Sequence, residues 1–135
     1  MTPSTALFTA VKARLAADAV LVNRLGSGRV HDGPPRNAAF PYVALEEIDS
    51  RDASGLNARL EQVSLVIRAY TRSGGRIDAM AIAADVVGAL DDAALPLAGH
   101  RLVRLFVRAT EARLGRDRLT AEATIRLSAL IEPAA

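Results

Sequence analysis

Cysteine is absent from this chain of 135 residues, which excludes disulfides, thiolate metal sites and a cysteine nucleophile. The sequence has two histidines, His31 and His100. A zinc site needs three or four ligands at workable spacing, and two isolated histidines do not supply them. We therefore expect no bound metal and no cofactor.

Aromatic residues and lysines are also scarce. Aromatic side chains make up 4% of the residues and hydrophobic ones 50%, much of it alanine, which predicts a thin aliphatic core. Lys12 is the only lysine, and the arginines are spread along the chain instead of forming a cluster. Nucleic-acid binding favours a basic stripe, so a small nucleic-acid-binding domain is an alternative with weak support.

Long apolar runs are missing as well, since no segment approaches the roughly 20 residues of a membrane-spanning helix. The N-terminus lacks the basic start, apolar block and cleavage site of a secretory signal. We expect no membrane association and a soluble protein of a reducing compartment. The length fits a single domain, residues 1–135.

Three helices are expected. Thr2 is a suitable N-cap for a helix to about Ala17, with proline at its first position. Asp18 is placed to cap a shorter helix over 19–25. A third helix over 77–90 carries an apolar stripe that we expect to be buried, namely Ile77, Met80, Ala81, Ala84 and Val87.

Strands are expected over residues 29–32, 42–50, 60–71, 101–110 and 119–131. Prolines stiffen the connector between the first two, a polar loop spans 49–59, and a hairpin turn at 114–117 relies on Gly115. The residues expected to face the core are Val63, Leu65, Ile67, Ala69, Val103, Leu105, Val107, Ala109, Ala121, Ala123, Ile125, Leu127 and Ala129. One buried face per strand predicts an α+β fold, with a mainly antiparallel sheet of four to five strands and helices packed on one face.

The opposite face of this sheet mixes charged and apolar side chains. Its expected members are Glu46, Arg68, Arg104, Arg108, Glu122, Arg126, Tyr42, Val66, Tyr70, Leu102 and Phe106. One interpretation is a solvated face whose charges pair across strands, each pair contributing less than about 1 kcal/mol. The other is an interface, because aromatic residues and arginine are favoured in interface cores.

No catalytic motif is evident, and we expect no enzyme and no catalytic residues. The sequence has neither G-x-S-x-G nor H-E-x-x-H. Neighbouring strand residues point to opposite faces, so His31 and Asp32 should be separated, and Glu46 and Glu47 likewise. An enzyme or small-ligand domain, the remaining alternative, would need a concave pocket with convergent polar groups.

Three stretches carry a resemblance to a known family. They are "RVHDGPPRNAAFPYVALEEIDSRD" from Arg29, "YTRSGGRIDAMAIAADVVGAL" from Tyr70 and "LAGHRLVRLFVRATEARLGRDRLTAEATIRLSALIEP" from Leu97. With the D-x-P…PYV entry, the S-R-D run and the R-S-G-G turn, the chain resembles the tail-completion family of long-tailed bacteriophages and gene transfer agents, over about Leu7 to Pro133. This chain has Tyr70 at a strand end where tryptophan is common in the family.

The resemblance implies a virion structural protein, a tail terminator at the head-proximal end of the tail. Such proteins form a ring, usually of six subunits, that ends polymerisation of the tail tube and joins it to the neck. The implied partners are copies of the chain itself, the tail tube protein, a neck or head–tail connector protein, and DNA passing transiently through the ring. Assembly would take place in the bacterial cytoplasm. A stopper or neck protein is the alternative within this class.

Polar and aromatic residues of the open sheet face and of the polar loop are the candidates for subunit or tube contacts. Arginine suits such contacts because its planar guanidinium pairs bidentately with carboxylates. The candidate interface residues are Arg51, Asp52, Arg104, Phe106, Arg108 and Arg126.

Overall fold

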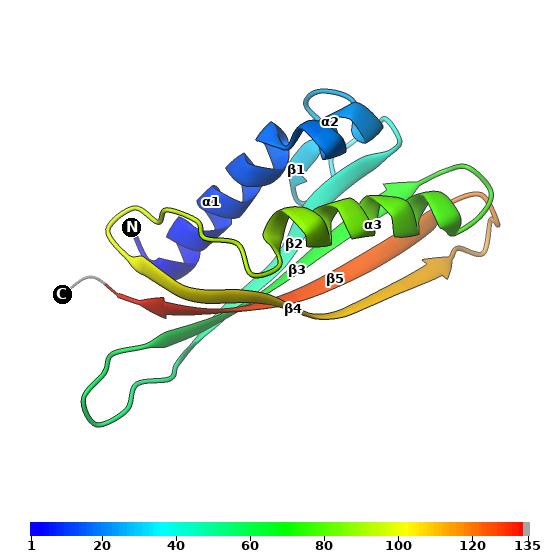
Figure 1. The fold of residues 1–135 in the computed structure, drawn as a ribbon. Coiled ribbons are helices and arrows are strands. Elements are labelled where there is room, and N and C mark those ends of the chain that lie inside the picture. Colours follow the sequence, from blue (N-terminus) through cyan, green and yellow to red (C-terminus); the bar gives the residue numbers. More distant parts are fainter. Residues whose placement is uncertain (134–135) are drawn as a thin grey trace.

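The computed structural model describes residues 1–133 and has three helices on one side of a five-stranded sheet (Figure 1). The helices are α1 (Pro3–Ala17), α2 (Ala19–Leu25) and α3 (Ile77–Leu90). The strands are β1 (Val30–Asp32), β2 (Tyr42–Asp52), β3 (Glu61–Thr71), β4 (Arg101–Leu114) and β5 (Ala121–Glu132). No helix among the described residues is long and apolar enough to cross a membrane.

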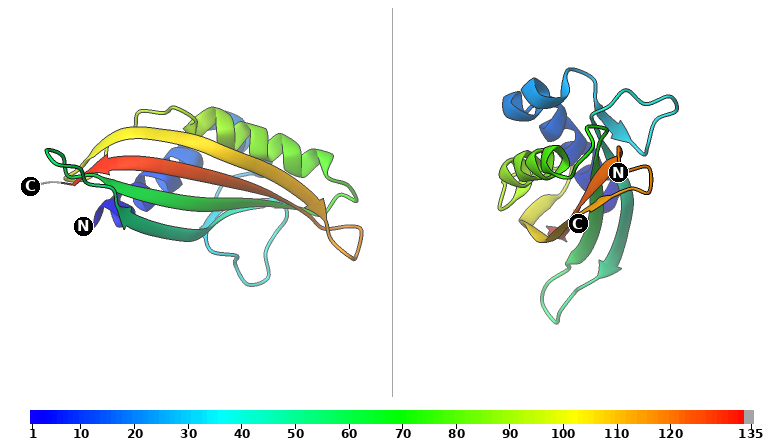
Figure 2. Two further views of the ribbon diagram at one scale, coloured as in Figure 1. Left: turned by 90° about the horizontal axis from the view of Figure 1, so that it is seen from below. Right: turned by 90° about the vertical axis from the view of Figure 1, so that its right-hand side faces the viewer.

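The sheet has the order β1-β2-β3-β5-β4. All neighbouring pairs are antiparallel except the short β1, which runs parallel to the start of β2. In the view from below, β4 forms one margin of the sheet and β2 lies near the other margin (Figure 2). The expected α+β fold, a mainly antiparallel sheet with helices on one face, is therefore confirmed.

The predicted caps of the first two helices are confirmed. The Thr2 hydroxyl accepts a hydrogen bond from the backbone N–H of Thr5 at 3.1 Å, and the Asp18 carboxylate accepts one from Leu21 at 3.0 Å. Each cap satisfies a backbone donor that the first helical turn leaves unpaired. Thr2 therefore marks the start of α1, and Asp18 marks both the end of α1 and the start of α2.

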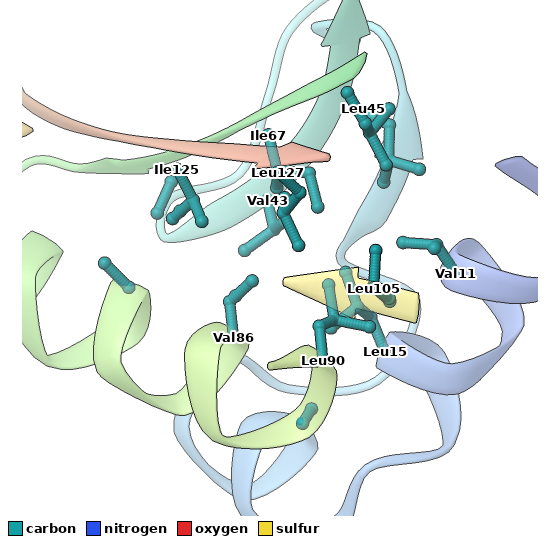
Figure 3. Packing of buried hydrophobic residues seen from close by; sticks show 14 of the residues in the cluster. Val11, Leu15, Val43, Leu45, Ile67, Val86, Leu90, Leu105, Ile125 and Leu127 are labelled. Atoms are coloured by element: carbon teal, nitrogen blue, oxygen red, sulfur yellow. The ribbon is translucent and has the colours of Figure 1, made fainter. Parts of the chain in front are cut away.

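The core lies between the helices and the inner face of the sheet (Figure 3). Val11 and Leu15 of α1, with Val86 and Leu90 of α3, meet the inward residues of the strands. The inward residues predicted for β3 and β5 are all buried. The core is aliphatic, as the composition predicts, and no phenylalanine is among its buried residues.

The predicted buried stripe of α3 is wrong. Ile77 and Met80 are 80% and 54% exposed, and the buried residues are Ala79, Ile82, Ala83, Val86, Ala89 and Leu90. The helix has apolar residues around most of its circumference, so spacing alone does not select the buried side. The buried side is the one that faces the sheet, where Ile82, Val86 and Leu90 lie in the core.

The inward face predicted for β4 is wrong at both ends. Irregularities between Leu102 and Arg104, and between Val107 and Ala109, each insert an extra residue against β5. Such a β-bulge shifts the alternation by one position. Leu102 therefore packs against the core, whereas Val103 is exposed and Ala109 falls on the other side of the sheet.

Two loops also differ from expectation. β2 continues to Asp52, so the predicted loop over 49–59 is a shorter hairpin loop over 53–60, which projects beyond the helices (Figure 1). In the β4–β5 turn, Arg118 and not Gly115 has a positive φ, 59°. Asp117 supports that turn by accepting hydrogen bonds from the backbone of Leu119 and Thr120.

Because Leu127 is fully buried at the centre of the sheet, its truncation to alanine removes apolar contacts that cannot be replaced. Leu127→Ala should lower the free energy of unfolding by about 2–5 kcal/mol. Leu56→Ala is the matched control, because Leu56 is 103% exposed and its truncation should change stability by less than about 0.5 kcal/mol. Urea unfolding followed by circular dichroism measures both, and equal effects would contradict the described core.

Candidate interaction surface

The face of the sheet turned away from the helices is called the outer face, and no helix of residues 1–133 covers it (Figure 2). At one end, Phe40 of the connector before β2 packs against Tyr42 of this face. The registers of β2, β3, β5 and β4 align its side chains in rows across the sheet. One row consists of Arg51, Gln62, Leu130 and Arg104, and another at the opposite end consists of Tyr42, Tyr70, Glu122 and Arg113. Residues far apart in sequence thus share one surface.

Arg68 is the centre of a hydrogen-bonded network on this face. Its guanidinium donates to Glu46 at 2.9 Å, to Glu47 at 3.2 Å and to the Thr124 hydroxyl at 3.2 Å. The Tyr70 hydroxyl donates to the other oxygen of Glu46. Burial opposes the charge of Arg68, but the hydrogen bonds to both glutamates outweigh it and raise its pKa. These contacts lock β2, β3 and β5 together on the outer side.

The two glutamates contradict the sequence expectation that they point to opposite faces. A bulge between Leu45 and Glu47 places an extra residue in β2, and both carboxylates reach Arg68. Glu46 is largely covered, whereas 63% of the Glu47 side chain is exposed. The bulge therefore adds an exposed acid to the outer face that simple alternation does not reveal.

An aromatic cluster lies at the start of β2. Tyr42 stacks on Tyr70 with ring centroids 4.9 Å apart, and it also contacts Phe40 at 5.3 Å and the edge of His31 at 5.8 Å. Burial, followed by interactions with Glu46, raises the pKa of both tyrosines. Offset or tilted ring pairs of this kind favour a rigid surface.

An open hollow of about 690 Å³ lies in the middle of the outer face. Its lining includes Glu47 and Asp49 from β2, and Arg108 and Arg126 from β4 and β5. Arg126 contacts Glu111 of β4 at 3.4 Å. The hollow joins the predicted interface residues Arg108 and Arg126 in one place and adds two acids that were not predicted.

Arg104 and Phe106 lie next along β4. The Arg104 guanidinium sits over the Phe106 ring, 4.4 Å from its centroid, which keeps both side chains on the outer face. Phe106 is opposite Ser128, whose hydroxyl accepts a hydrogen bond from Gln62 at 3.1 Å. The structure therefore places these two candidates beside the hollow.

Arg51 and Asp52 lie at the far end of β2, where the 53–60 loop begins. Arg51 is in the same row as Arg104, whereas Asp52 accepts a hydrogen bond from the backbone of Ser54 at 2.9 Å. Hydrogen bonds from Ser54 hold the pKa of Asp52 below its ordinary value. Asp52 thus stabilises the loop and is set apart from the other candidates.

The histidines lie elsewhere and are separated from each other. His31 is in β1 against Tyr42, and a ring nitrogen of His100 is 2.9 Å from the carbonyl oxygen of Met1. Across residues 1–133, no group of three or more histidine, aspartate or glutamate side chains is arranged to hold a metal ion.

Both tyrosines of the chain should resist ionisation in the folded state. Tyrosine in an unfolded chain is half ionised near pH 10, so the folded protein should show little tyrosinate absorbance at that pH and the urea-unfolded protein about half. Since the folded-state pKa values lie above the unfolded ones, this contribution to stability is present below about pH 10 and is lost as the pH rises through them. Equal absorbance in both states would contradict the burial of Tyr42 and Tyr70.

Comparison with known proteins identifies the family. The family described as tail completion protein gp17 matches residues 9–132. A chain in the solved virion of a native gene transfer agent particle has 34% identity and a TM-score of 0.85, over 95% of this chain and 96% of that chain.

The gp17 protein of bacteriophage SPP1 has 19% identity and a TM-score of 0.62, over 93% of this chain and 88% of that chain, which shows the same fold. The comparison with curated protein sequences gives no match. Because the family match spans almost the whole chain and agrees with the predicted resemblance, this chain belongs to the tail completion protein gp17 family.

Proposed function

We propose that this chain is a structural component of a phage or gene-transfer-agent virion and acts there as the tail terminator. Copies of it, six in number, form a ring at the head-proximal end of the tail tube. The ring ends polymerisation of the tube and offers its other side to the neck or connector protein. The observation that carries the proposal is the likeness, over nearly the full length, to a chain of a gene transfer agent virion.

The outer face supports a role in assembly. It combines exposed arginines, a carboxylate network and aromatic rings on one side of a sheet that no helix covers. Arginine and aromatic residues are enriched in interface cores. A contact between two different surfaces of identical subunits closes into a ring when its rotation allows. Such an arrangement needs no catalysis, and we propose no enzymatic activity.

The proposed passage of DNA through the ring is compatible with the charge of the chain. Strong DNA binding requires many uncompensated basic side chains against the phosphates. Here the formal net charge is only +2, and arginines of the outer face lie among Glu46, Glu47 and Asp49. Contacts with phosphates would therefore be weak enough for the genome to slide past during delivery.

The proposal is tested by adding the purified chain to growing tail tubes. Closed rings at one tube end, seen by negative-stain microscopy, and an end to tube growth are the expected results, with a mass of six chains by native mass spectrometry. Rings that bind only the neck protein would identify a stopper. A chain that remains monomeric and ignores tubes would contradict the proposal.

Arg104→Glu should abolish completion of particles without changing the circular dichroism spectrum, because Arg104 is exposed on the outer face. Arg14→Glu makes the same change of charge at an exposed position of α1 and should leave the particle yield unchanged. A normal particle yield with Arg104→Glu would show that Arg104 is not an interface residue.

A further inference from the structure

The outer face is polarised in charge from one margin to the other. Its β2 margin has three acids within four residues, Glu46, Glu47 and Asp49. Its β4 margin has four arginines, Arg101, Arg104, Arg108 and Arg113, of which Arg101 is paired with Glu132 of β5. Two side chains have the opposite charge to the rest of their margin. Arg51 lies at the end of the acidic β2 margin, and Glu111 lies within the basic β4 margin.

These charges are poorly neutralised within one chain. Asp49, Arg108 and Arg113 are exposed and form no ion pair with any of residues 1–133. Glu47 shares the single Arg68 with Glu46, whereas the exceptional Glu111 is paired with Arg126. The unpaired charge that remains is negative on the β2 margin and positive on the β4 margin.

The strands of the two margins are separated by three inter-strand spacings of about 4.8 Å, or about 14 Å in all. Glu47, Asp49 and Arg108 line the same open hollow, but no ion pair joins the two margins across it. Asp49 and Arg108 therefore lack a partner among residues 1–133, and each can take an opposite charge from outside the chain.

Both margins lie at open borders of the sheet. β1 pairs with β2 only as far as Leu45, and among residues 1–133 the only strand that pairs with β4 is β5. The middle of β4 is protected against strand addition, because the Asp91 carboxylate accepts a hydrogen bond from the backbone N–H of Val107 at 2.9 Å. A neighbour would thus be held by side chains at this point and not by a continuous backbone ladder.

We propose that the β2 margin of one copy docks on the β4 margin of the next copy, with Glu47 and Asp49 facing Arg104 and Arg108. The occupant is a second copy because this chain itself carries both complementary charges on opposite borders. Carboxylates and guanidinium groups form bidentate pairs that fix orientation as well as proximity. Since the two margins of one chain are different surfaces, the contact repeats head to tail, and this deepens the ring that we propose above.

Paired charge reversals test this docking. The first variant carries Glu47→Arg and Asp49→Arg, so both its margins are basic; the second carries Arg104→Glu and Arg108→Glu, so both are acidic. In the presence of tail tubes, each variant alone should lose rings, while remaining folded by circular dichroism. An equimolar mixture should restore closed rings in which the variants alternate, and native mass spectrometry should find them in equal numbers.

Each result separates this docking from other arrangements. Rings formed by either variant alone, or no rescue in the mixture when the wild-type chain forms rings, would overturn the pairing of margins but leave the terminator function standing. A mixed species that stops at two chains, under conditions in which the wild-type chain forms rings, would show that the contact does not repeat head to tail and would also overturn it. Failure of the wild-type chain to form rings would contradict both proposals.

Discussion

The sheet of this protein buries one face against the helices and leaves the other face exposed. Three helices cover one face, and the strands alternate so that Val63, Leu65 and Ile67 enter the core while their neighbours point away. Every second residue of four long strands must then be accommodated on the uncovered face. Hydrogen bonds around Arg68 and ring stacking around Tyr42 satisfy part of this surface, and exposed charges occupy its margins.

Hydrogen bonds within the chain and contacts with other copies would use the same polar side chains of this face. Glu46 accepts hydrogen bonds from Arg68 and Tyr70 of its own chain, so it stiffens the surface. Glu47 and Asp49, which the β-bulge and the end of β1 leave exposed, are available to a partner. In the ring that we propose, a rigid centre with exposed charges at its margins would let copies of the chain bind one another with little loss of conformational entropy.

The sequence predicts regular elements well and irregular ones poorly. Every residue that strict alternation predicts to face inward in β3 and β5 is buried, although the buried Ile131 at the end of β5 was not included. Short polar side chains before α1 and α2 identify the caps of these two helices. The β-bulges of β2 and β4 leave no mark that alternation can reveal, so the directions of Glu47 and Ala109 were not predictable. In α3, alanines on both sides of the helix hide which side is buried, and only the position of the sheet decides it.

In the assembly that we propose, the margins of the outer face become covered when copies associate. Carbodiimide labelling of carboxylates, read by mass spectrometry, tests it directly in the free chain and in completed particles. We expect Glu47 and Asp49 to lose reactivity on assembly, whereas Asp78 at the exposed start of α3 keeps it. If Glu47 and Asp49 are labelled equally in the free chain and in the particle, the proposed docking of the margins is wrong.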